Sequence, residues 1–511
     1  MVNLMHNLDK FLDHRIQKWF MSLSLVATLL LTLTLPIPQT GHFDSELHAQ
    51  SPSVKPGDWP YFLGPRQTGI SPETNLLDKF PEQGPPLLWE KKIGTGYSAP
   101  SILGSKLVIH HRPDGNREGK EVIECVDAST GKELWKYEYA SDFRDPYGYN
   151  NGPRCSPLLT SKHCYTFGAQ GKLYCLNLED GKLVWHIDCM KEFNVPPGFF
   201  GVGSTPILEG NKLIVMVGGK PNSGMVAFDA LTGKKLWENV GKDVWNGTST
   251  GWERLPVYKW RGNEKISSYS SPLAVTIHGK RHLLCLMRQG LVSLDPQDGS
   301  VNFKYWFRSM INDSVNAARP VVVDDKIFLS AAYQVGSALL QVTPDGKSYK
   351  ELWRNPTNML THWSTTIDHD GYLYGFSGRH ERGATMRSVR LSDGKVMWET
   401  DGTEPVIGKV KRNQLTGQYQ WVDSGKTAPW PFYGRGSAIL ADNKFIVLGE
   451  RGTLAIVKVD PEHFTEICRT SFPQIKYPAW AAPVLAHKKL YLRSESHLIC
   501  LDFEKKPAEK E

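Results

Sequence analysis

One unit of sequence recurs along this chain: an apolar strand, a tight turn, and a second strand that opens with tryptophan. Its clearest copy runs from Cys125 to Trp135 and reads CVDASTGKELW. Segments 175–185 and 227–237 repeat it as CLNLEDGKLVW and AFDALTGKKLW. The glycine marks a tight turn, because it adopts positive φ without strain. A single unit of this size cannot bury its own apolar faces, so the chain is expected to fold as an array of such units.

A second landmark opens an apolar strand in each unit. It is a small residue followed by proline, and two degenerate copies, Thr365-Thr366 and Ser437-Ala438, lack the proline. The prolines of the other copies are Pro100, Pro157, Pro206, Pro272, Pro320 and Pro483. The tryptophan landmark also occurs eight times, with the exit residues Trp89, Trp135, Trp185, Trp237, Phe303, Trp353, Trp398 and Ile467. A spacing of roughly 45–70 residues is typical of the four-stranded blades of a β-propeller.

The two ends of the repeat region complement one another. Residues 86–90 have the pattern of the tryptophan-bearing strand that ends a unit, called here the exit strand, but no unit precedes them. The last unit, 482–503, lacks an exit strand. An N-terminal strand that completes the last blade would close the ring and remove its open edges. We therefore predict an all-β, eight-bladed β-propeller of four-stranded blades. The alternative is seven blades, with the weak copy near Ile467 belonging to an insertion.

The first 49 residues have the pattern of an export signal. Basic residues precede the apolar run 21–35, and Leu47-His48-Ala49 provides a small-residue cleavage context. The alternative is an uncleaved N-terminal anchor, because the run approaches the length of a membrane span. The predicted organisation is 1–49 signal peptide or anchor, 50–84 N-terminal extension leading into the ring, 85–503 propeller and 504–511 charged tail. We expect an exported protein, located in the periplasm, at the cell surface or outside the cell.

Charge and cysteine content exclude several function classes. A net charge of +7 arises from 60 basic and 53 acidic residues without a long basic block, so no nucleic-acid partner is expected. None of the eight cysteines forms a CxxC pair, which argues against a zinc site, and several occupy apolar strand positions typical of buried thiols. The chain has no GxSxG, P-loop, HExxH or EF-hand motif. We predict neither catalytic nor metal-binding residues.

The repeated unit resembles a known family. Asp127 to Trp135 and Phe228 to Trp237 are similar to the pyrroloquinoline-quinone-type (PQQ-like) propeller repeat, which occurs in quinoprotein alcohol dehydrogenases and in BamB-type outer-membrane assembly scaffolds. The opening GDWPYFLGP at 57–65 is similar to the secreted PQQ-like repeat proteins of planctomycete-type bacteria. The resemblance implies a PQQ-like propeller over 85–503. Quinoprotein dehydrogenases carry two adjacent cysteines over the cofactor, and no pair of this kind is present here.

Aligning the units on the small-residue-proline landmark identifies a candidate site. Three positions before the proline, the units carry Tyr97, Arg154, Gly203, Tyr269, Ala317, Trp363, Arg435 and Trp480, and Asn316 and His362 stand one position earlier. If the landmark strand is innermost, these side chains surround one mouth of the central channel. The predicted ligand-binding residues are Tyr97, Arg154, Tyr269, Asn316, His362, Trp363, Arg435 and Trp480. The alternative is that they plug the channel and stack on each other.

Two connections between landmarks are long, 238–268 and 399–434. Such loops usually gather on one face of a repeat scaffold and contribute to binding, and plain surface hairpins are the alternative.

Aromatic rings combined with arginine suit a flat anionic ligand, a glycan or a peptide terminus. We expect a binding or protein-interaction scaffold at the cell envelope, with envelope proteins or a small anionic or glycan ligand as partners. Membrane contact would come only from a retained N-terminal segment. One alternative is a PQQ-dependent alcohol or sugar dehydrogenase, and another is a glycan- or peptide-binding module. The sequence requires no cofactor, and PQQ with Ca2+ is the one that the resemblance allows.

Overall fold

The computed structural model describes residues 55–113, 119–196, 200–248, 257–309, 315–403, 410–414 and 418–507. The export signal or anchor predicted over 1–49 lies outside these residues. Within the described ranges, no helix has both the length and the apolar character needed to cross a membrane.

Four-stranded antiparallel sheets account for almost all of the described secondary structure, and there are eight of them. We number them as blades in chain order. Blades 1 to 4 consist of β2 (Ser101–Leu103), β3 (Lys106–His111), β4 (Lys120–Asp127) and β5 (Glu133–Ala140); β6 (Leu158–Leu159), β7 (His163–Phe167), β8 (Lys172–Asn177) and β9 (Leu183–Asp188); β10 (Ile207–Glu209), β11 (Lys212–Gly219), β12 (Ser223–Asp229) and β13 (Lys235–Asn239); β16 (Leu273–Ile277), β17 (Lys280–Met287), β18 (Gly290–Leu294) and β19 (Val301–Trp306).

The second half of the ring repeats this arrangement. Blades 5 to 8 consist of β20 (Val321–Val323), β21 (Lys326–Ala331), β22 (Gly336–Val342) and β23 (Tyr349–Asn355); β24 (Ile367–His369), β25 (Tyr372–Ser377), β26 (Thr385–Arg390) and β27 (Val396–Thr400); β30 (Ser437–Ala441), β31 (Lys444–Leu448), β32 (Thr453–Lys458) and β33 (Glu466–Ser471); β34 (Val484–Ala486), β35 (Lys489–Arg493), β36 (His497–Asp502) and β1 (Leu87–Lys92).

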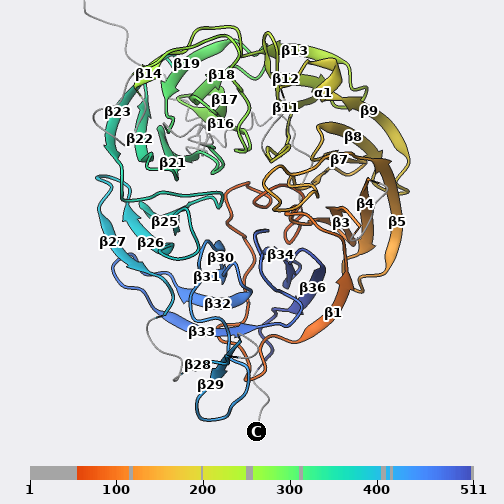
Figure 1. The fold of residues 1–511 in the computed structure, drawn as a ribbon, viewed down its shortest axis with the longest axis vertical. Coiled ribbons are helices and arrows are strands. Elements are labelled where there is room, and N and C mark those ends of the chain that lie inside the picture. The colour runs from red at the N-terminus through yellow and green to blue at the C-terminus, as the bar shows by residue number, and fades with distance from the viewer. Residues whose placement is uncertain are drawn as a thin grey trace, which may run out of the picture. The chain divides into compact units, whose positions relative to one another are not determined.

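Figure 1 shows the blades arranged around a central axis, with the first strand of each blade nearest the centre and the fourth at the rim. Blade 8 closes the ring as the sequence predicts. Its outer strand, β1, comes from the N-terminal end of the chain and pairs antiparallel with β36, with Trp89 opposite Cys500. The eight-bladed, all-β propeller is therefore confirmed.

The exit tryptophans act as joints between neighbouring blades. The indole Nε1 of Trp135 in blade 1 donates a hydrogen bond to the carbonyl of Leu178 in the turn of blade 2, at 3.0 Å. Its ring packs on Gly181, where an added Cβ would lie 2.6 Å from the indole. The same donation, from an exit tryptophan to a carbonyl of the next blade, is made by Trp89, Trp185, Trp237, Trp353 and Trp398. The repeated tryptophan is therefore structural, because each one ties a blade to the next.

Blade 7 departs from the predicted pattern. The position opposite Ile456 in its outer strand, which corresponds to the exit tryptophan of the other blades, is Cys468. Ile467, the exit residue predicted from the sequence, is instead 40% exposed. The prediction was one residue out because side chains of a strand alternate between its two faces and this copy has no tryptophan to fix the register. The Cys468 sulfur accepts a hydrogen bond from the backbone N–H of Phe80, at 3.2 Å.

The hydrophobic core lies between blades and is not concentrated at one centre. One cluster joins blades 2 and 3 through Phe167, Cys175, Val215 and Phe228, and another joins blades 4 and 5 through Leu284, Phe303 and Leu329. Seven of the eight cysteines are buried and all eight are free thiols. Because each blade buries its faces only against its neighbours, the axis of the ring is left for other side chains.

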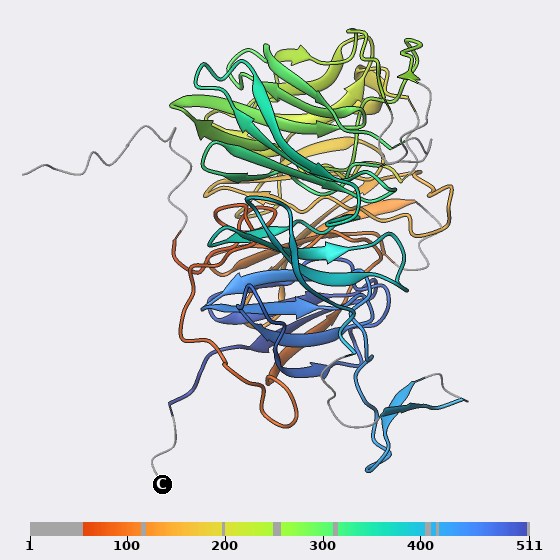
Figure 2. The ribbon, with the colours of Figure 1, turned by 90° about the vertical axis from the view of Figure 1, so that its left-hand side faces the viewer.

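Two short hairpins extend from the ring. One consists of β14 (Gly247–Thr248) and β15 (Val257–Tyr258), and the other of β28 (Val410–Arg412) and β29 (Tyr419–Trp421). Both belong to the long connections predicted to carry binding, and both lie on the same side of the ring (Figure 2). We call this side the mouth face. The only other regular element of the described residues is the single-turn helix α1 (Cys189–Glu192).

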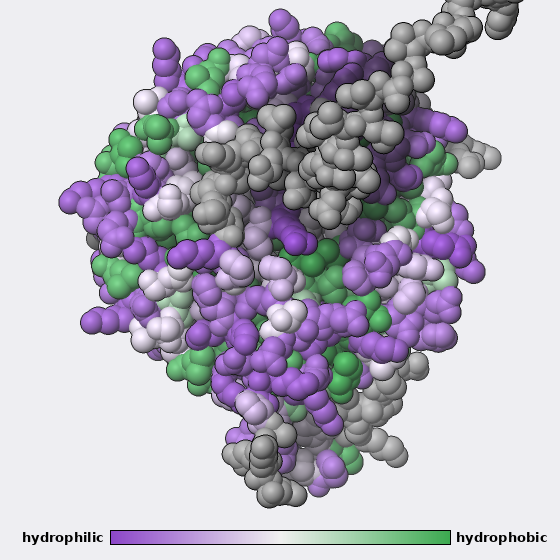
Figure 3. All heavy atoms as spheres, turned by 180° about the vertical axis from the view of Figure 1, so that it is seen from behind, coloured by the Kyte–Doolittle hydropathy of each residue, from purple (hydrophilic) through white to green (hydrophobic). Residues whose placement is uncertain are grey.

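The N-terminal segment 57–71 crosses the opposite side of the ring, which we call the floor face (Figure 2). Trp59 pairs with Ile102 of blade 1, and the Pro60 carbonyl accepts from the backbone of Leu159 in blade 2. Farther along, Gln67 accepts two hydrogen bonds from Arg319 at the entry to blade 5, and Ser71 donates to Leu440 of blade 7. Seen from this side, the described surface is largely hydrophilic, with hydrophobic side chains in small patches (Figure 3).

Candidate functional site

A cavity of about 320 Å³ lies on the axis of the ring. Its wall includes all eight residues that the alignment of the repeats placed three positions before the proline, one from each blade: Tyr97, Arg154, Gly203, Tyr269, Ala317, Trp363, Arg435 and Trp480. These residues lead into the innermost strands, so equivalent register brings them to equivalent depth. Of the eight predicted site residues, all but Asn316 line the cavity.

A deeper tier consists of small and hydroxyl-bearing residues, which stand one position before the landmark proline. Ser156, Thr205 and Ser271 belong to it, and they link neighbouring blades. The Thr205 hydroxyl accepts from the Ser156 backbone at 3.2 Å, and the Ser271 hydroxyl accepts from the Thr205 backbone at 2.9 Å. Phe62 and Leu63 of the segment that crosses the floor face also line the cavity. The chain therefore covers the channel at the floor end.

Aromatic rings form a continuous series around the mouth. Trp480 lies 4.8 Å from Tyr97, 4.9 Å from Trp363 and 5.8 Å from Tyr149, measured between ring centroids. Phe200 continues the series to Tyr269, at 5.5 Å. Tyr147 and Tyr149 are about half exposed, at 50% and 51%, so their rings are partly available to solvent at the mouth of the cavity. A wall of this composition suits the apolar face of a ligand ring.

Arg435 is held between two of these rings. Its guanidinium carbon lies 4.8 Å from the Trp363 centroid and 5.1 Å from that of Trp480, distances at which a cation is attracted to an aromatic face. The same guanidinium donates to the buried carboxylate of Glu450, with the shortest contact, Nη2 to Oε2, at 2.8 Å. Trp480 Nε1 also donates to Glu450, at 2.9 Å. The positive charge of Arg435 is therefore already compensated within the protein.

Arg154 is compensated in the same way. Its Nη2 donates to Asp145 Oδ2 and to the Asn150 carbonyl, both at 2.7 Å, and its Nη1 donates to the Gly152 carbonyl. Burial lowers the pKa of the Arg154 guanidinium, and the Asp145 carboxylate opposes that shift. Arg154 therefore holds the connection between blades 1 and 2 in place while it forms part of the cavity wall.

His362 and Asn316 have different environments. His362 lines the cavity, and burial together with the nearby charge of Arg435 lowers its pKa to about 3, so the imidazole is neutral at physiological pH. Asn316 does not line the cavity. Its amide donates to the carbonyls of Met287 and Phe307, at 2.8 and 3.0 Å, and it serves to fix the connection into blade 5.

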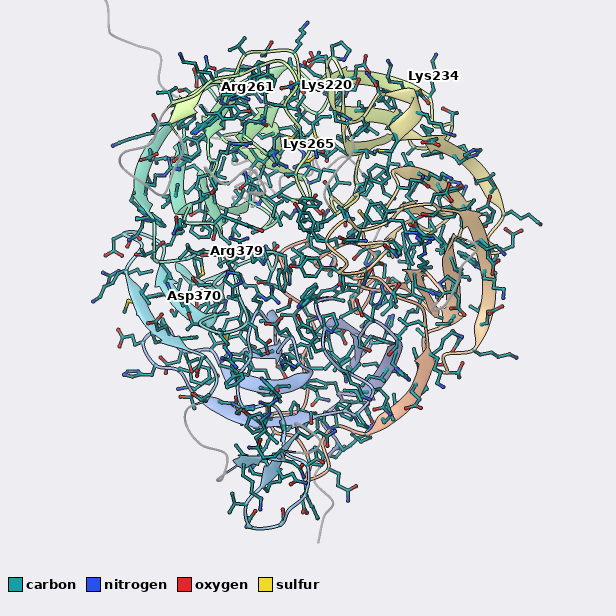
Figure 4. All side chains as sticks on the ribbon, viewed as in Figure 1. Lys220, Lys234, Arg261, Lys265, Asp370 and Arg379 are labelled. Atoms are coloured by element: carbon teal, nitrogen blue, oxygen red, sulfur yellow. The ribbon has the colours of Figure 1, made fainter. Side chains whose placement is uncertain are left out.

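Several lining residues were not among the predicted site residues. Arg379 and His380 belong to the loop between β25 and β26, and Figure 4 places Arg379 on the side of its blade that faces the centre of the ring. Phe62 and Leu63 come from the N-terminal extension. Aligning the loops between the second and third strands would have indicated the first pair. The floor residues lie outside the repeat, so no repeat register could have identified them.

The described residues contain no group of three or more His, Cys, Asp or Glu side chains placed to hold a metal ion. Cys155, next to Arg154 in sequence, is fully buried, and burial raises the pKa of its thiol. A thiol in that state is unreactive.

These features define a closed eight-bladed β-propeller with an aromatic axial cavity that is covered at one end. Residues 119–400, more than half of the chain, match the family described as outer membrane protein assembly factor BamB, and the chain belongs to this BamB-like family of PQQ-repeat propellers.

Comparisons with individual proteins agree with this assignment. The outer membrane protein assembly factor BamB of Shewanella oneidensis is 25% identical over 415 residues, which cover 73% of this chain and 89% of the relative. The crystal structure of BamB from Moraxella catarrhalis superposes with a TM-score of 0.52 at 12% identity, covering 82% of this chain and all of that one. The quinohemoprotein alcohol dehydrogenase of Comamonas testosteroni gives 0.55 at 12% identity, covering 90% and 82%. At this identity the two structural likenesses show the fold alone.

Proposed function

We propose that this chain is a binding scaffold of the cell envelope, which holds a ligand or a segment of a partner in its axial cavity and carries out no reaction there. The observation that carries the proposal is the register of the wall: each blade contributes the residue at one equivalent position, and together these residues enclose a single cavity. A layer that served only to fill the channel would leave no such space. The similarity to BamB assembly factors supports a role in the envelope.

The charge arrangement supports binding over redox catalysis. A PQQ-type quinone is anionic and acts together with a bound metal ion. Here Arg154 and Arg435 already pair with Asp145 and Glu450, and Asp145 is the one carboxylate among the described residues that line the cavity, so little negative charge is left there to hold a Ca2+ ion. The donor set does not fit PQQ with Ca2+, and we derive no redox step from it.

Titration separates the two functions. Purified protein would be mixed with PQQ and Ca2+, and quinone absorbance, calorimetric heat and dye-linked alcohol oxidation would be measured. We expect no stoichiometric quinone binding and no oxidation above the rate without protein. Saturable binding of PQQ accompanied by alcohol-dependent dye reduction would overturn the scaffold function and establish the dehydrogenase.

Site-specific cross-linking tests the scaffold directly. A photoreactive amino acid would replace Tyr149 at the mouth or, as a matched control, Leu231, which is 61% exposed in the turn of blade 3. We expect envelope components to cross-link at position 149 and not at position 231. Equal yields at both positions, or products only at 231, would contradict a partner site at the mouth. Fractionation of the same cells tests whether the chain resides in the envelope.

A further inference from the structure

We infer that the cavity is built for an acidic sugar, with the sugar ring against Trp363 and its carboxylate at Arg379. This inference rests on the proposed binding function and names the class of ligand. It starts from the unequal wall of the cavity. At the register three positions before the landmark, six blades contribute bulky side chains, whereas blades 3 and 5, on either side of Tyr269 in blade 4, contribute Gly203 and Ala317. Tyr269 packs against Gly203 on that side of the cavity, opposite Trp480 of blade 8.

Blade 6 provides neutral polar atoms that the protein itself does not satisfy. His362 Nδ1, Trp363 Nε1 and Thr365 Oγ1 are buried without a hydrogen-bond partner, and all three residues line the cavity. Buried polar atoms nearly always have a hydrogen-bond partner. Three atoms without one on a single short segment therefore indicate groups that form hydrogen bonds with a ligand or a bound water. With its pKa lowered to about 3, His362 offers a neutral imidazole. Neutral donors and acceptors of this kind match the hydroxyl groups of a sugar.

Arg379 provides the charge. It is exposed, its guanidinium lies 4.3 Å from the centroid of the Tyr333 ring, and it belongs to the same blade as His362 and Trp363. Among the described residues no carboxylate forms an ion pair with it, in contrast to Arg154 and Arg435. Arg379 is thus the one arginine of the cavity wall whose charge is not compensated within the described structure. A carboxylate that enters from the mouth would meet it first.

The combination discriminates between ligand classes. A planar aromatic acid would use the rings and Arg379 but would leave the orphan atoms of blade 6 unsatisfied, which is costly in a buried site. A neutral sugar would leave Arg379 unpaired. A uronic acid has a C–H face for the indole, hydroxyl groups for the neutral polar atoms and a carboxylate for the guanidinium. The degenerate landmark, Thr365-Thr366, belongs to this blade, so the sequence departs from the repeat where these groups gather.

The test uses the full chain and defined saccharides. Digalacturonate and diglucuronate would be titrated by calorimetry, with the neutral disaccharides cellobiose and lactose and the planar acid 2-naphthoate as comparisons. We expect the uronates to bind and the neutral sugars to bind at least 10-fold more weakly. Arg379→Ala should weaken uronate binding about 10- to 100-fold, the value of a charge-assisted hydrogen bond, and leave neutral-sugar binding unchanged. Arg382→Ala, in the same exposed loop but outside the cavity wall, is the matched control.

Each other result overturns the inference. Equal binding of neutral and acidic sugars would remove the role of Arg379, tighter binding of 2-naphthoate would replace the sugar with an aromatic acid, and no binding of any uronate would exclude the class. The binding function itself is judged separately, by the cross-link at position 149. A cross-linked partner without uronate binding would leave the scaffold in place with a different ligand.

Discussion

The outer rim and the cavity wall are built from the same eight blades but differ in how strictly they repeat. The residues of the outer strands repeat one contact, whereas the residues at the inner register, three positions before the landmark proline, vary from blade to blade. At the rim, six tryptophans make the same indole-to-carbonyl hydrogen bond to the next blade. Around the cavity, eight equivalent positions hold five residue types, from Gly203 to Trp480. The rim is constrained by a contact that six of the eight blades make. The inner register lines the cavity, so its side chains are free to differ from blade to blade.

The rim joint is expected to give the largest loss of stability. Trp135 is 8% exposed, packs on Gly181 and loses both its packing and its hydrogen bond on truncation. Trp135→Ala should lower the free energy of unfolding by about 3–5 kcal/mol, as measured by denaturant titration. Trp363→Ala, whose indole nitrogen has no partner in the protein, should cost less than half as much. Equal losses would mean that the inner tryptophan is also a joint.

The Arg435–Glu450 ion pair belongs to the cavity wall and is also expected to stabilise the fold. Arg435→Ala leaves the Glu450 carboxylate, 1% exposed, without its cation, and should cost about 3 kcal/mol or more. Arg435→Ala combined with Glu450→Gln should restore a large part of that loss. If the single variant is as stable as the parent, the pair contributes nothing to the fold and Arg435 becomes available as a ligand-binding group.

Glycine substitutions separate backbone strain from the contact with tryptophan. Gly181 and Gly371 both have positive φ, +71° and +80°, but an added Cβ would touch only the Trp135 ring at Gly181 and nothing within 4 Å at Gly371. Gly371→Ala should cost about 1–2 kcal/mol for the backbone alone. Gly181→Ala should cost more because the indole must also move. Thermal unfolding measures both, and equal costs would show that the turn glycine does not support the joint.

A further contrast is a pH dependence that belongs to the inner register. Because burial lowers the pKa of His362 from 6.5 to about 3, the unfolded chain binds a proton at this residue between those values and the folded chain does not. The free energy of unfolding should therefore fall as the pH is lowered from 6.5 towards 3. His362→Gln should flatten this slope, whereas His463→Gln, at an exposed position in blade 7, should leave it unchanged. An unchanged slope in both variants would place His362 in contact with solvent.

Repetition explains how much of this molecule the sequence could predict. Two landmarks that each occur eight times were sufficient for the blade number, the closure through β1 and the depth of Trp363 and Trp480. The error at Ile467 arose in the copy without an exit tryptophan. Charge compensation of Arg154 by Asp145, nine residues earlier, and the covering of the floor by Phe62 depend on loop conformations that no repeat encodes. Arg379 was missed because only the entry to the first strand of each blade was aligned, and not the loop between the second and third strands.

Fluorine NMR of the chain labelled with 5-fluorotryptophan tests the central contrast between rim and cavity most directly. Resonances would be assigned by Trp→Phe substitution and followed during titration with digalacturonate and with the partner captured at position 149. The account predicts saturable shifts for Trp363 and Trp480, with Trp135, Trp185 and Trp237 unchanged. Shifts confined to the rim tryptophans, or a saturated complex in which Trp363 and Trp480 do not move, would contradict it.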